Sequence, residues 1–583
     1  MKTFRLQTII AVAACFCALL LIGGIFLKNN VTGKSVRVSD FGAIGDGVTD
    51  DRQAVEKAFE ALLTGDAGFM GKRTLFFDQK SYLIGDKNDS WYVFSIPSTS
   101  RLTIAGNGAV LLLSSGNLAF HFDRCDFLTV KDLTFDYWDL PYTQGTIIHV
   151  DRQTASIDVE IHEGYPVPPT DSFLSSNGQH TSGGGGRHGL VFEKDEYLRN
   201  MDMTIDHVKA RSITHIRDNV YRFILEDDYA GQIARIQCGN RFTYGFNGMN
   251  IPAEDLRRKK GMNFGLMYFN ICRHLLLDNV SIYTSMNNGF RTCESSGIIQ
   301  NTRILVKPGT NRLISVLSDG FHIKNTRDKL IIEDCLVEST GDDGINVSTM
   351  EEYVVEILDP LQLKLRTTDV QHYFYPIRKG DHLQFFDATK TFMLGSAEVT
   401  AVETDPANRL NLVTLNKPVE NITVGNLDNG THAYNLNQVS TGIIIRNNTV
   451  KPLLRNALLV RMHGGLIENN RIQSRGGVVG ISLSSDKMFR VGPYPSDVRV
   501  TGNILEGLSG RGILVSSGFP GVEDKPSRNI ILDENTIHMR QGPGITLMDV
   551  QAVTLTKNII ETPSVHPISI VRSHDVVIDG VSQ

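Results

Sequence analysis

Several features that mark particular protein classes are scarce in this 583-residue sequence. The net charge is only −6, and the 58 basic and 64 acidic residues are interspersed along the chain. The sequence therefore lacks the basic stripe expected of a nucleic-acid-binding protein. The same balance argues against a strongly anionic partner and favours a neutral one. Tryptophan occurs only at Trp91 and Trp138, so the C-terminal part of the chain offers no tryptophan for stacking on a ligand.

The cysteines indicate neither a disulfide framework nor a zinc site. Five of the seven lie beyond the N-terminal apolar segment, an odd number without a C-x-x-C pair. We expect most of these five to be buried as small apolar side chains. They are Cys125, Cys238, Cys272, Cys293 and Cys335. No metal and no other cofactor is predicted.

The first 28 residues differ from the rest of the chain. Lys2 and Arg5 precede an apolar run over residues 9–27, and Lys28 follows it. This pattern predicts a signal peptide, or an uncleaved membrane anchor with its N-terminus inside. We therefore expect an exported protein, which is periplasmic, extracellular or anchored on the outer side of a membrane. The oligomeric state stays open.

Short β-branched or leucine-rich runs that end in Asn or Asp recur along the chain. Their last residues are Asn279, Asn301, Asp334, Asn448, Asn470, Asn503, Asn535 and Asn558. Successive spacings are 22, 33, 114, 22, 33, 32 and 23 residues. A period of 22–23 residues fits one coil of a parallel β-helix, and Asn tolerates the turns and can bind its stacked neighbour. The sequence thus predicts an all-β fold, a right-handed parallel β-helix. A leucine-rich solenoid would need an L-x-x-L-x-L pattern, which is missing.

Two stretches interrupt this repeat, at residues 140–262 and 351–440. Both contain alternating strands and predict inserted antiparallel β-barrel or sandwich domains. A glycine-rich run, Gly183 to Gly186, lacks the strand–helix frame of a phosphate site and indicates a loop. The remaining parts are a cap with the first coils (36–139), the central coils (263–350) and the C-terminal coils (441–583).

An acidic pair near the N-terminus, Asp50–Asp51, precedes a helical stretch that ends at about Leu63. Thr49 is the expected cap of this helix, and the two aspartates favour its N-terminus. The apolar face is expected at Ala54, Ala58, Ala61 and Leu62. Such a helix would cover the open end of the β-helix, so this pair has a structural role.

A second acidic pair, Asp342–Asp343, follows Asp319 by 23 and 24 residues. That spacing is one coil, and neighbouring coils lie about 4.8 Å apart. Three carboxylates so close together repel one another, which raises the pKa of at least one of them. Glycoside hydrolysis needs such a combination of a carboxylic acid and a carboxylate base. For both residues of the pair to serve, they must lie at a strand edge or bend, which the flanking Gly341 and Gly344 allow.

Other polar residues are expected on the same face of the β-helix, where they could bind a sugar. His322 follows Asp319 by three residues, and Asn346 follows Asp343 by three. The coil before supplies Asn287, Asn288, Arg291 and Glu294, and the coil after the second insertion supplies Arg461 and His463. For each of these, a role in an ordinary turn or solvated loop is the alternative.

These motifs resemble known families. The Asp40–Gly47 segment is similar to the cap of pectin-degrading β-helix enzymes, and the Asp-Gly … Gly-Asp-Asp pattern resembles the polygalacturonases. A closer resemblance is to glycoside hydrolase family 110, bacterial exo-α-1,3-galactosidases that remove the terminal galactose of blood group B structures. That family has a D-x-x-H segment followed by D-D-x-I-N-V, as in Asp319–His322 and Asp342–Val347. It also has two β-barrel insertions in the helix.

The resemblance implies inverting, metal-independent release of α-linked galactose from a neutral oligosaccharide or glycan. Asp342 would be the general acid, and Asp319 and Asp343 would position and deprotonate water. The chain departs from the family at Ser348–Thr349, where His-Gly is expected, and at residues 488–495, which lack its Trp and Glu. Tyr494 or Phe489 could replace that aromatic group. The alternatives are a β-helix hydrolase or lyase for another polysaccharide and a non-catalytic carbohydrate-binding protein.

Overall fold

The computed structural model describes most of the chain after residue 32. The described ranges are 33–64, 71–171, 189–193, 196–197, 208–226, 232–246, 265–368, 374–387, 393–426, 428–474, 479–485, 491–518 and 527–580. The apolar segment 9–27 and the glycine run at 183–186 lie outside them. Among the described residues, no helix is long and apolar enough to span a membrane.

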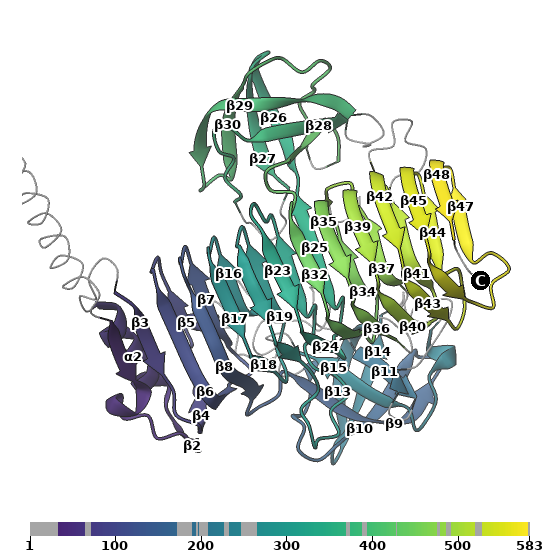
Figure 1. Ribbon diagram of the computed structural model, residues 1–583. Coiled ribbons are helices and arrows are strands. Elements are labelled where there is room, and N and C mark those ends of the chain that lie inside the picture. Colours follow the sequence, from purple (N-terminus) through teal and green to yellow (C-terminus); the bar gives the residue numbers. More distant parts are fainter. Residues whose placement is uncertain are drawn as a thin grey trace, which may run out of the picture.

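The main body is a parallel β-helix, as the repeat predicts (Figure 1). Each complete coil contributes one strand to a 12-stranded sheet and two strands to a 23-stranded sheet. In one coil, β19 (Asn288–Cys293) lies in the first sheet, and β20 (Gly297–Gln300) and β21 (Arg303–Ile304) lie in the second. The next coil repeats this with β22 (Phe321–Lys324), β23 (Leu330–Glu333) and β24 (Leu336–Glu338), paired in parallel with their counterparts.

The 12-stranded sheet carries the predicted site residues. Its parallel strands in chain order are β5 (Tyr92–Ile96), β7 (Leu118–Asp123), β16 (Gly265–Asn270), β19, β22, β25 (Ile345–Met350), β34 (Asn456–Val460), β37 (Val479–Ser484), β41 (Arg511–Ser516), β44 (Ile545–Met548) and β47 (Ile568–Val571). The short β38 (Val491–Gly492) pairs antiparallel with β25.

Apolar side chains at equivalent positions of successive coils form one continuous core. Ile299, Ile332, Ile445 and Ile467 stand in register and are fully buried. Burying one such side chain contributes about 1.5–3 kcal/mol. The β-branched runs of the sequence are therefore the inward faces of the coils.

The recurrent Asn residues occupy two different positions of the coil. Asn448, Asn470, Asn503, Asn535 and Asn558 form a buried ladder in which each Nδ2 donates to the next Oδ1 at 2.9–3.0 Å. This confirms the predicted stacking. In contrast, Asn279, Asn301 and Asp334 lie one position earlier in the coil and adopt left-handed φ angles of 50–54°. Asn448 stacks on Cys335, whose backbone N–H it accepts at 3.0 Å.

The first insertion contains a seven-stranded antiparallel sheet with its own apolar core. Its strands are β9 (Tyr142–Asp151), β10 (Ser156–Ile161), β11 (Gly189–Glu193), β12 (Glu196–Tyr197), β13 (Ala210–Arg217), β14 (Val220–Leu225) and β15 (Arg241–Gly245). This sheet lies below the β-helix in the view of Figure 1.

The second insertion is a closed six-stranded barrel, above the β-helix in Figure 1. Its strands are β26 (Glu352–Asp359), β27 (Gln362–Thr367), β28 (His382–Asp387), β29 (Met393–Asp405), β30 (Leu410–Leu415) and β31 (Thr431–Asn435). The chain leaves the β-helix after β25 and returns at β32 (Ile443–Arg446). The barrel is therefore inserted within one coil, between its strand of the 12-stranded sheet and its strands of the 23-stranded sheet.

The N-terminal helix α2 (Arg52–Thr64) packs on the first coils, as predicted. Its buried face consists of Val55, Ala58, Phe59 and Leu62. The predicted face had Ala54 and Ala61 in place of Val55 and Phe59, so it was rotated about the helix axis relative to the observed face. Thr49 does not cap the helix, because it lies in β2 (Asp46–Asp50) and its hydroxyl donates to Asp46. Instead, the Asp50 carboxylate accepts the Arg52 N–H at 2.9 Å.

Candidate active site

Two Asp-Gly steps stack on neighbouring coils of the 12-stranded sheet. Asp319-Gly320 directly precedes β22, and Asp343-Gly344 directly precedes β25. A Cβ at Gly320 would lie 2.5 Å from the Gly344 carbonyl oxygen, and one at Gly344 would lie 2.5 Å from that of Ala457. Only glycine permits this close approach of the coils. The glycines therefore hold each preceding aspartate at the start of its strand.

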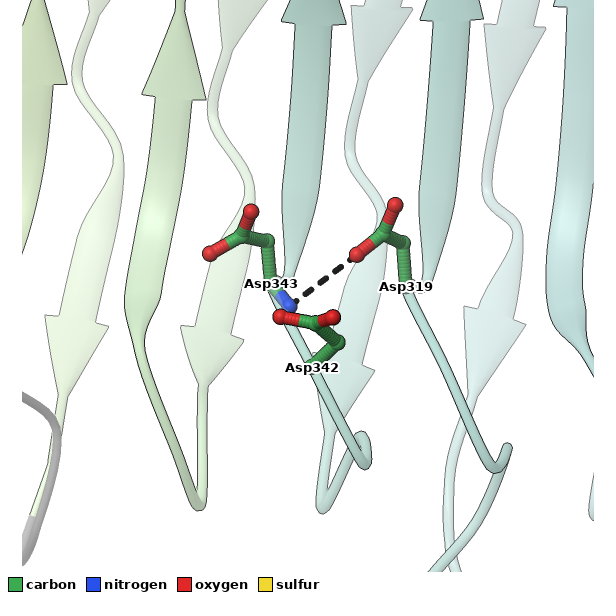
Figure 2. A group of neighbouring side chains, drawn as sticks. All are labelled: Asp319, Asp342 and Asp343. Atoms are coloured by element: carbon green, nitrogen blue, oxygen red, sulfur yellow. Dashed lines mark hydrogen bonds between the residues drawn. The ribbon is translucent and has the colours of Figure 1, made fainter. Parts of the chain in front are cut away.

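Four polar residues on consecutive coils form a hydrogen-bonded carboxylate column, defined by Asn288, Asp319, Asp343 and Asn456. Asn288 Oδ1 accepts the Asp319 N–H at 3.1 Å, and Asp319 Oδ1 accepts the Asp343 N–H at 3.1 Å (Figure 2). Asp343 Oδ1 accepts the N–H of Asn456 at 3.0 Å and its Nδ2 at 2.8 Å. The side chains of Asn288, Asp319 and Asp343 each contact the next coil along the helix, and the side chain of Asn456 contacts the coil before it. The column fixes one oxygen of both carboxylates.

The second oxygen of each carboxylate contacts a residue three positions later on its own strand. His322 Nδ1 contacts Asp319 Oδ2, and Asn346 Nδ2 donates to Asp343 Oδ2 at 3.2 Å. His322 and Asn346 stand in register on β22 and β25. Both predicted residues therefore join the site, and they hold the two aspartates rather than standing apart from them.

Asp342 differs from the other two aspartates because it is partly exposed. Its side chain is 32% exposed, whereas Asp319 and Asp343 are 4% exposed. Its Oδ1 lies 3.1 Å from Nε of Arg455 on the next coil. One oxygen from each of the three carboxylates lies within 4.8 Å of the others. The structure thus places the three predicted carboxylates together.

Burial changes the proton affinity of the inner pair. Loss of hydration raises the pKa of Asp319 to about 6, against the stabilising hydrogen bond from the Asp343 N–H. Burial, together with the charge of the neighbouring Asp319, raises the pKa of Asp343 to about 6. Carboxyl groups in this range exchange protons close to neutral pH. Such groups suit general acid–base chemistry.

Three buried cationic residues lie around the pair. Arg291 stands in register with His322, and it and Lys324 lower the pKa of Asp319. Arg461 lowers the pKa of Asp343 and donates from Nε to the Ser484 carbonyl at 2.8 Å. These cations partly offset the charge of the carboxylates. The sequence predicted Arg291 and Arg461 as site residues but missed Lys324, although it follows His322 by two residues and so shares its face.

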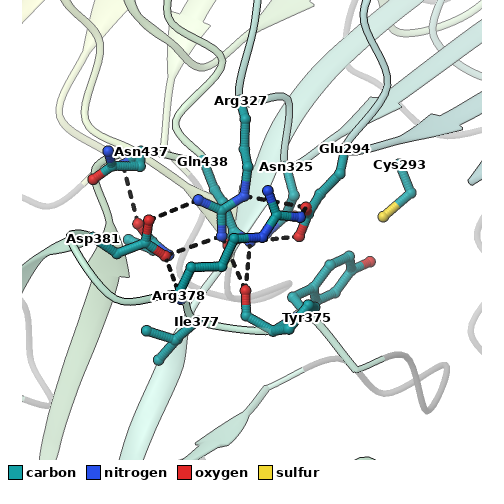
Figure 3. Close-up of polar contacts among 12 residues, drawn as sticks. Cys293, Glu294, Asn325, Arg327, Tyr375, Ile377, Arg378, Asp381, Asn437 and Gln438 are labelled. Carbon is teal, nitrogen blue, oxygen red and sulfur yellow. Dashed lines mark hydrogen bonds and ion pairs between the residues drawn. The ribbon is translucent and has the colours of Figure 1, made fainter. Parts of the chain in front are cut away.

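Glu294 does not reach the carboxylates. It follows the far end of β19, where Gln438 donates to it at 2.6 Å and Arg327 at 3.1 Å. Arg327 also binds Asp381 of the barrel insertion, at 2.7 Å (Figure 3). Arg378 contacts the same Glu294 oxygen as Arg327. Glu294 therefore belongs to a polar joint between the β-helix and the barrel.

Three other predictions are placed elsewhere by the structure. Asn287 lies in the turn before β19, where its Oδ1 accepts the Asn288 N–H at 2.8 Å. His463 begins β35 (His463–Glu468) of the 23-stranded sheet, and burial lowers its pKa to about 4. Tyr494 is buried against Phe386, with ring centroids 5.3 Å apart, so it is a core residue rather than a platform. Phe489 lies outside the described residues.

Arg455 and Asn456 are two further site residues that sequence reasoning missed. Both follow the second insertion, 113 residues after Asp342 and Asp343 respectively. The one-coil spacing from Asp342 and Asp343 would have indicated these two residues only if the residues of the barrel had first been left out of the count.

No family model matches the chain. It is 23% identical over 565 residues to "Alpha-1,3-galactosidase A" of Shewanella woodyi, covering 93% of this chain and 88% of that protein. It is 22% identical over 592 residues to "Alpha-1,3-galactosidase B" of Bacteroides thetaiotaomicron, covering 95% and 90%.

The chain is also detectably similar to solved structures. One is a family 28 exopolygalacturonase of Yersinia enterocolitica, with a TM-score of 0.40, 11% identity and coverage of 94% of this chain and 78% of that one. Another is the A-module of the mannuronan C-5 epimerase AlgE6 of Azotobacter vinelandii, with a TM-score of 0.38, 11% identity and coverage of 94% and 98%.

The fold, the site and the sequence similarity together indicate which class of protein this chain belongs to. The chain is a parallel β-helix protein with three clustered carboxylates. Over nearly its whole length it is similar to glycoside hydrolases, and the relatives named above are alpha-1,3-galactosidases.

Proposed function

We propose that this protein is an exo-acting glycoside hydrolase that releases terminal α-1,3-linked galactose with inversion at the anomeric carbon. The observation that carries the proposal is the cluster of Asp319, Asp342 and Asp343, whose oxygens lie within 4.8 Å of one another. The similarity to alpha-1,3-galactosidases over 93% of the chain supports the choice of sugar and linkage.

The three carboxylates divide the reaction between them. The buried pair, Asp319 and Asp343, holds a water molecule and takes its proton as the water oxygen bonds to the anomeric carbon. Asp342 protonates the leaving glycosidic oxygen as the bond between that oxygen and the anomeric carbon breaks. Asp342 suits the acid role because it is the most exposed of the three and can reach the leaving group. Its contact with Arg455 must loosen for Asp342 to carry the proton.

The spacing of the carboxylates bears on the stereochemistry. An inverting enzyme generally separates its acid and base by about 6.5–9.5 Å, whereas retaining enzymes use about 5–5.5 Å. The oxygens here approach within 4.8 Å, closer than the sequence-based expectation for inversion. An inverting mechanism at this spacing requires that Asp319 and Asp343 together hold one water molecule. The anomer of the first product decides between inversion and retention.

The cations beside the pair favour a second candidate substrate. Arg291, Lys324 and Arg461 could neutralise the carboxylate of a uronic acid, as a polygalacturonase-like hydrolase would require. Each of them also offsets an aspartate of the site, so a neutral galactoside leaves no cation without a counter-charge. We therefore place the uronic acid polymer second.

A substrate panel tests the proposal. Purified protein is incubated with a nitrophenyl α-galactoside, an α-1,3-linked galactose disaccharide, the blood group B trisaccharide and polygalacturonate, with and without a chelator. We expect galactose from the α-galactosides, none of it sensitive to the chelator, and no product from polygalacturonate. Affinity without turnover would indicate a carbohydrate-binding protein. A chelator-sensitive, ultraviolet-absorbing product would indicate a lyase.

A further inference from the structure

The carboxylate column ends in an amide on each side, and the two amides make different contacts. The side-chain oxygen of Asn288 accepts a hydrogen bond from the backbone N–H of Asp319. Asn456 donates both its backbone N–H and its Nδ2 to Oδ1 of Asp343, at 3.0 and 2.8 Å. The second amide therefore acts directly on a carboxylate of the pair.

We propose that Asn456 is a positioning residue that fixes the orientation of Asp343 and sets the proton affinity of the Asp319–Asp343 pair. This inference rests on the proposed function, in which that pair is the general base. Asn456 would act through Asp343 and would not itself touch the substrate.

Hydrogen bonding supplies the physical reason. Two donors on one carboxylate oxygen stabilise the ionised form and oppose the effects of burial and of the Asp319 charge. They also leave Oδ2 of Asp343, bound only weakly by Asn346 at 3.2 Å, as the oxygen available to a water molecule. The titratable and charged groups around the pair are Asp342, His322, Arg291, Lys324, Arg455 and Arg461.

The fold explains why this residue is separated so far from its partner in sequence. Asn456 opens β34, the first strand of the 12-stranded sheet after the barrel insertion. In register, the next residue of the column would be Val479, so the column stops at Asn456. Asn456 thus begins the first coil after the one that the barrel interrupts.

The buried asparagine ladder provides a matched control. Asn470, later on the same coil, is buried and bonds to Asn448 and Asn503, which are also amides. Asn456→Ala and Asn470→Ala therefore remove the same side chain from two positions of one coil. Only the first removes a donor from the pair.

Two readouts separate this proposal from the proposed function. The first is the carbon-13 NMR titration of aspartate carboxyl groups, which needs no activity. We expect Asn456→Ala to raise the apparent pKa of the pair by about 0.5–1 unit, because one of the two donors that stabilise the ionised Asp343 is lost and the backbone donor remains. Asn456→Asp should raise it further through like-charge repulsion, and Asn470→Ala should leave it in place. The second readout is the acid limb of kcat/KM on an α-galactoside, which should move in parallel.

Asn456→Ser retains a shorter donor and tests the proposal if the alanine variant does not fold. It should give a shift between those of wild type and alanine. An unchanged titration in the folded Asn456 variants, or an equal shift in Asn470→Ala, would overturn the proposal. A wild-type protein that cleaves no galactoside would overturn the proposed function, while the NMR titration would still decide the role of Asn456.

Discussion

The Asp50–Asp51 and Asp342–Asp343 pairs are the same dipeptide at two places in one β-helix, and their surroundings differ. The Asp51 carboxylate accepts the backbone N–H groups of Ile44 and Gly45 at 2.6 and 2.9 Å. Asp50 accepts those of Arg52 and Gly85, both at 2.9 Å. The Asp343 carboxylate also accepts a backbone N–H, that of Asn456 at 3.0 Å, but a second buried carboxylate lies one coil away and accepts the N–H of Asp343.

This difference distinguishes an acid pair with a structural role from the pair that is proposed to be reactive. At the N-terminal pair, neutral donors satisfy the charges and tie the first coils to α2. At the second pair, burial raises the pKa of Asp343, and the charge of a further buried acid adds to this effect. A stacked carboxylate on the adjacent coil is thus the feature that matters, and four predictions test this comparison.

The largest expected effect is on catalysis. Asp343→Asn should lower kcat/KM for α-galactosides by about 10²–10⁴-fold, because it removes a general base. Asp51→Asn should leave kcat/KM per folded molecule within about twofold, a range far below the contribution of a general base. Steady-state kinetics of the two purified variants gives the answer. Equal losses in both would contradict the division into structural and reactive pairs.

The next effect distinguishes the roles of Asp342 and Asp343. Asp342→Asn should reduce hydrolysis of an α-1,3-linked disaccharide by about 10²–10⁴-fold. Its effect on a dinitrophenyl galactoside should be much smaller, because that leaving group departs without a proton. Asp343→Asn should impair both substrates alike. The ratio of the two rates for each variant measures this. The opposite pattern would make Asp343 the acid.

The pH dependence of activity is the third prediction. Because the pKa values of Asp319 and Asp343 are raised to about 6, the pair loses its basic form as the pH falls through that value. The kcat/KM of the wild type should therefore decline below about pH 6, up to tenfold per pH unit. An acid limb near pH 4 would show that the inner pair is not the base.

The smallest effect is on the free energy of unfolding at pH 7. A substitution at Asp343 should raise it, and one at Asp51 should lower it. The folded-state pKa of Asp343 lies above the value of 3.8 for an exposed aspartate, so the native protein loses stability as the pH rises from about 4 to about 6. Asp343→Asn should therefore raise the free energy of unfolding at pH 7 by about 1–3 kcal/mol, and the gain should vanish at pH 4. Denaturant unfolding at both pH values measures the change.

Asp51→Ala should act in the other direction. It leaves two backbone N–H groups without their acceptor and should cost about 1–3 kcal/mol at pH 7. A stabilising Asp51→Ala or a destabilising Asp343→Asn would remove the contrast between the pairs.

The sequence predicted the parts of the molecule that depend on repeated local patterns. The Asn spacing predicted the β-helix, because each ladder residue binds the equivalent residue of the next coil. The one-coil step from Asp319 to Asp343 predicted their contact. Local spacing also gave Asn346 and His322, since both lie three residues after an aspartate on the same strand.

The errors arose where long-range contacts decide. Glu294 is an acidic residue of the kind expected in a sugar-binding site, but Arg327 and, from the barrel insertion, Arg378 bind it. His463 follows Arg461 by two residues, yet the chain turns between them into the other sheet. Arg455 and Asn456 were missed because the barrel separates them from the aspartates. The Thr49 prediction failed for a different, local reason, because the Thr49 hydroxyl donates to Asp46 in a turn instead of capping the helix.

The most direct test of the account is a proton NMR time course of the wild-type protein with an α-1,3-linked galactose disaccharide, recorded before the released sugar mutarotates. The account predicts that β-galactose is the first product, formed by direct attack of a water molecule held by Asp319 and Asp343. α-Galactose as the first product would contradict this water mechanism, and the absence of any released galactose would contradict the hydrolase itself.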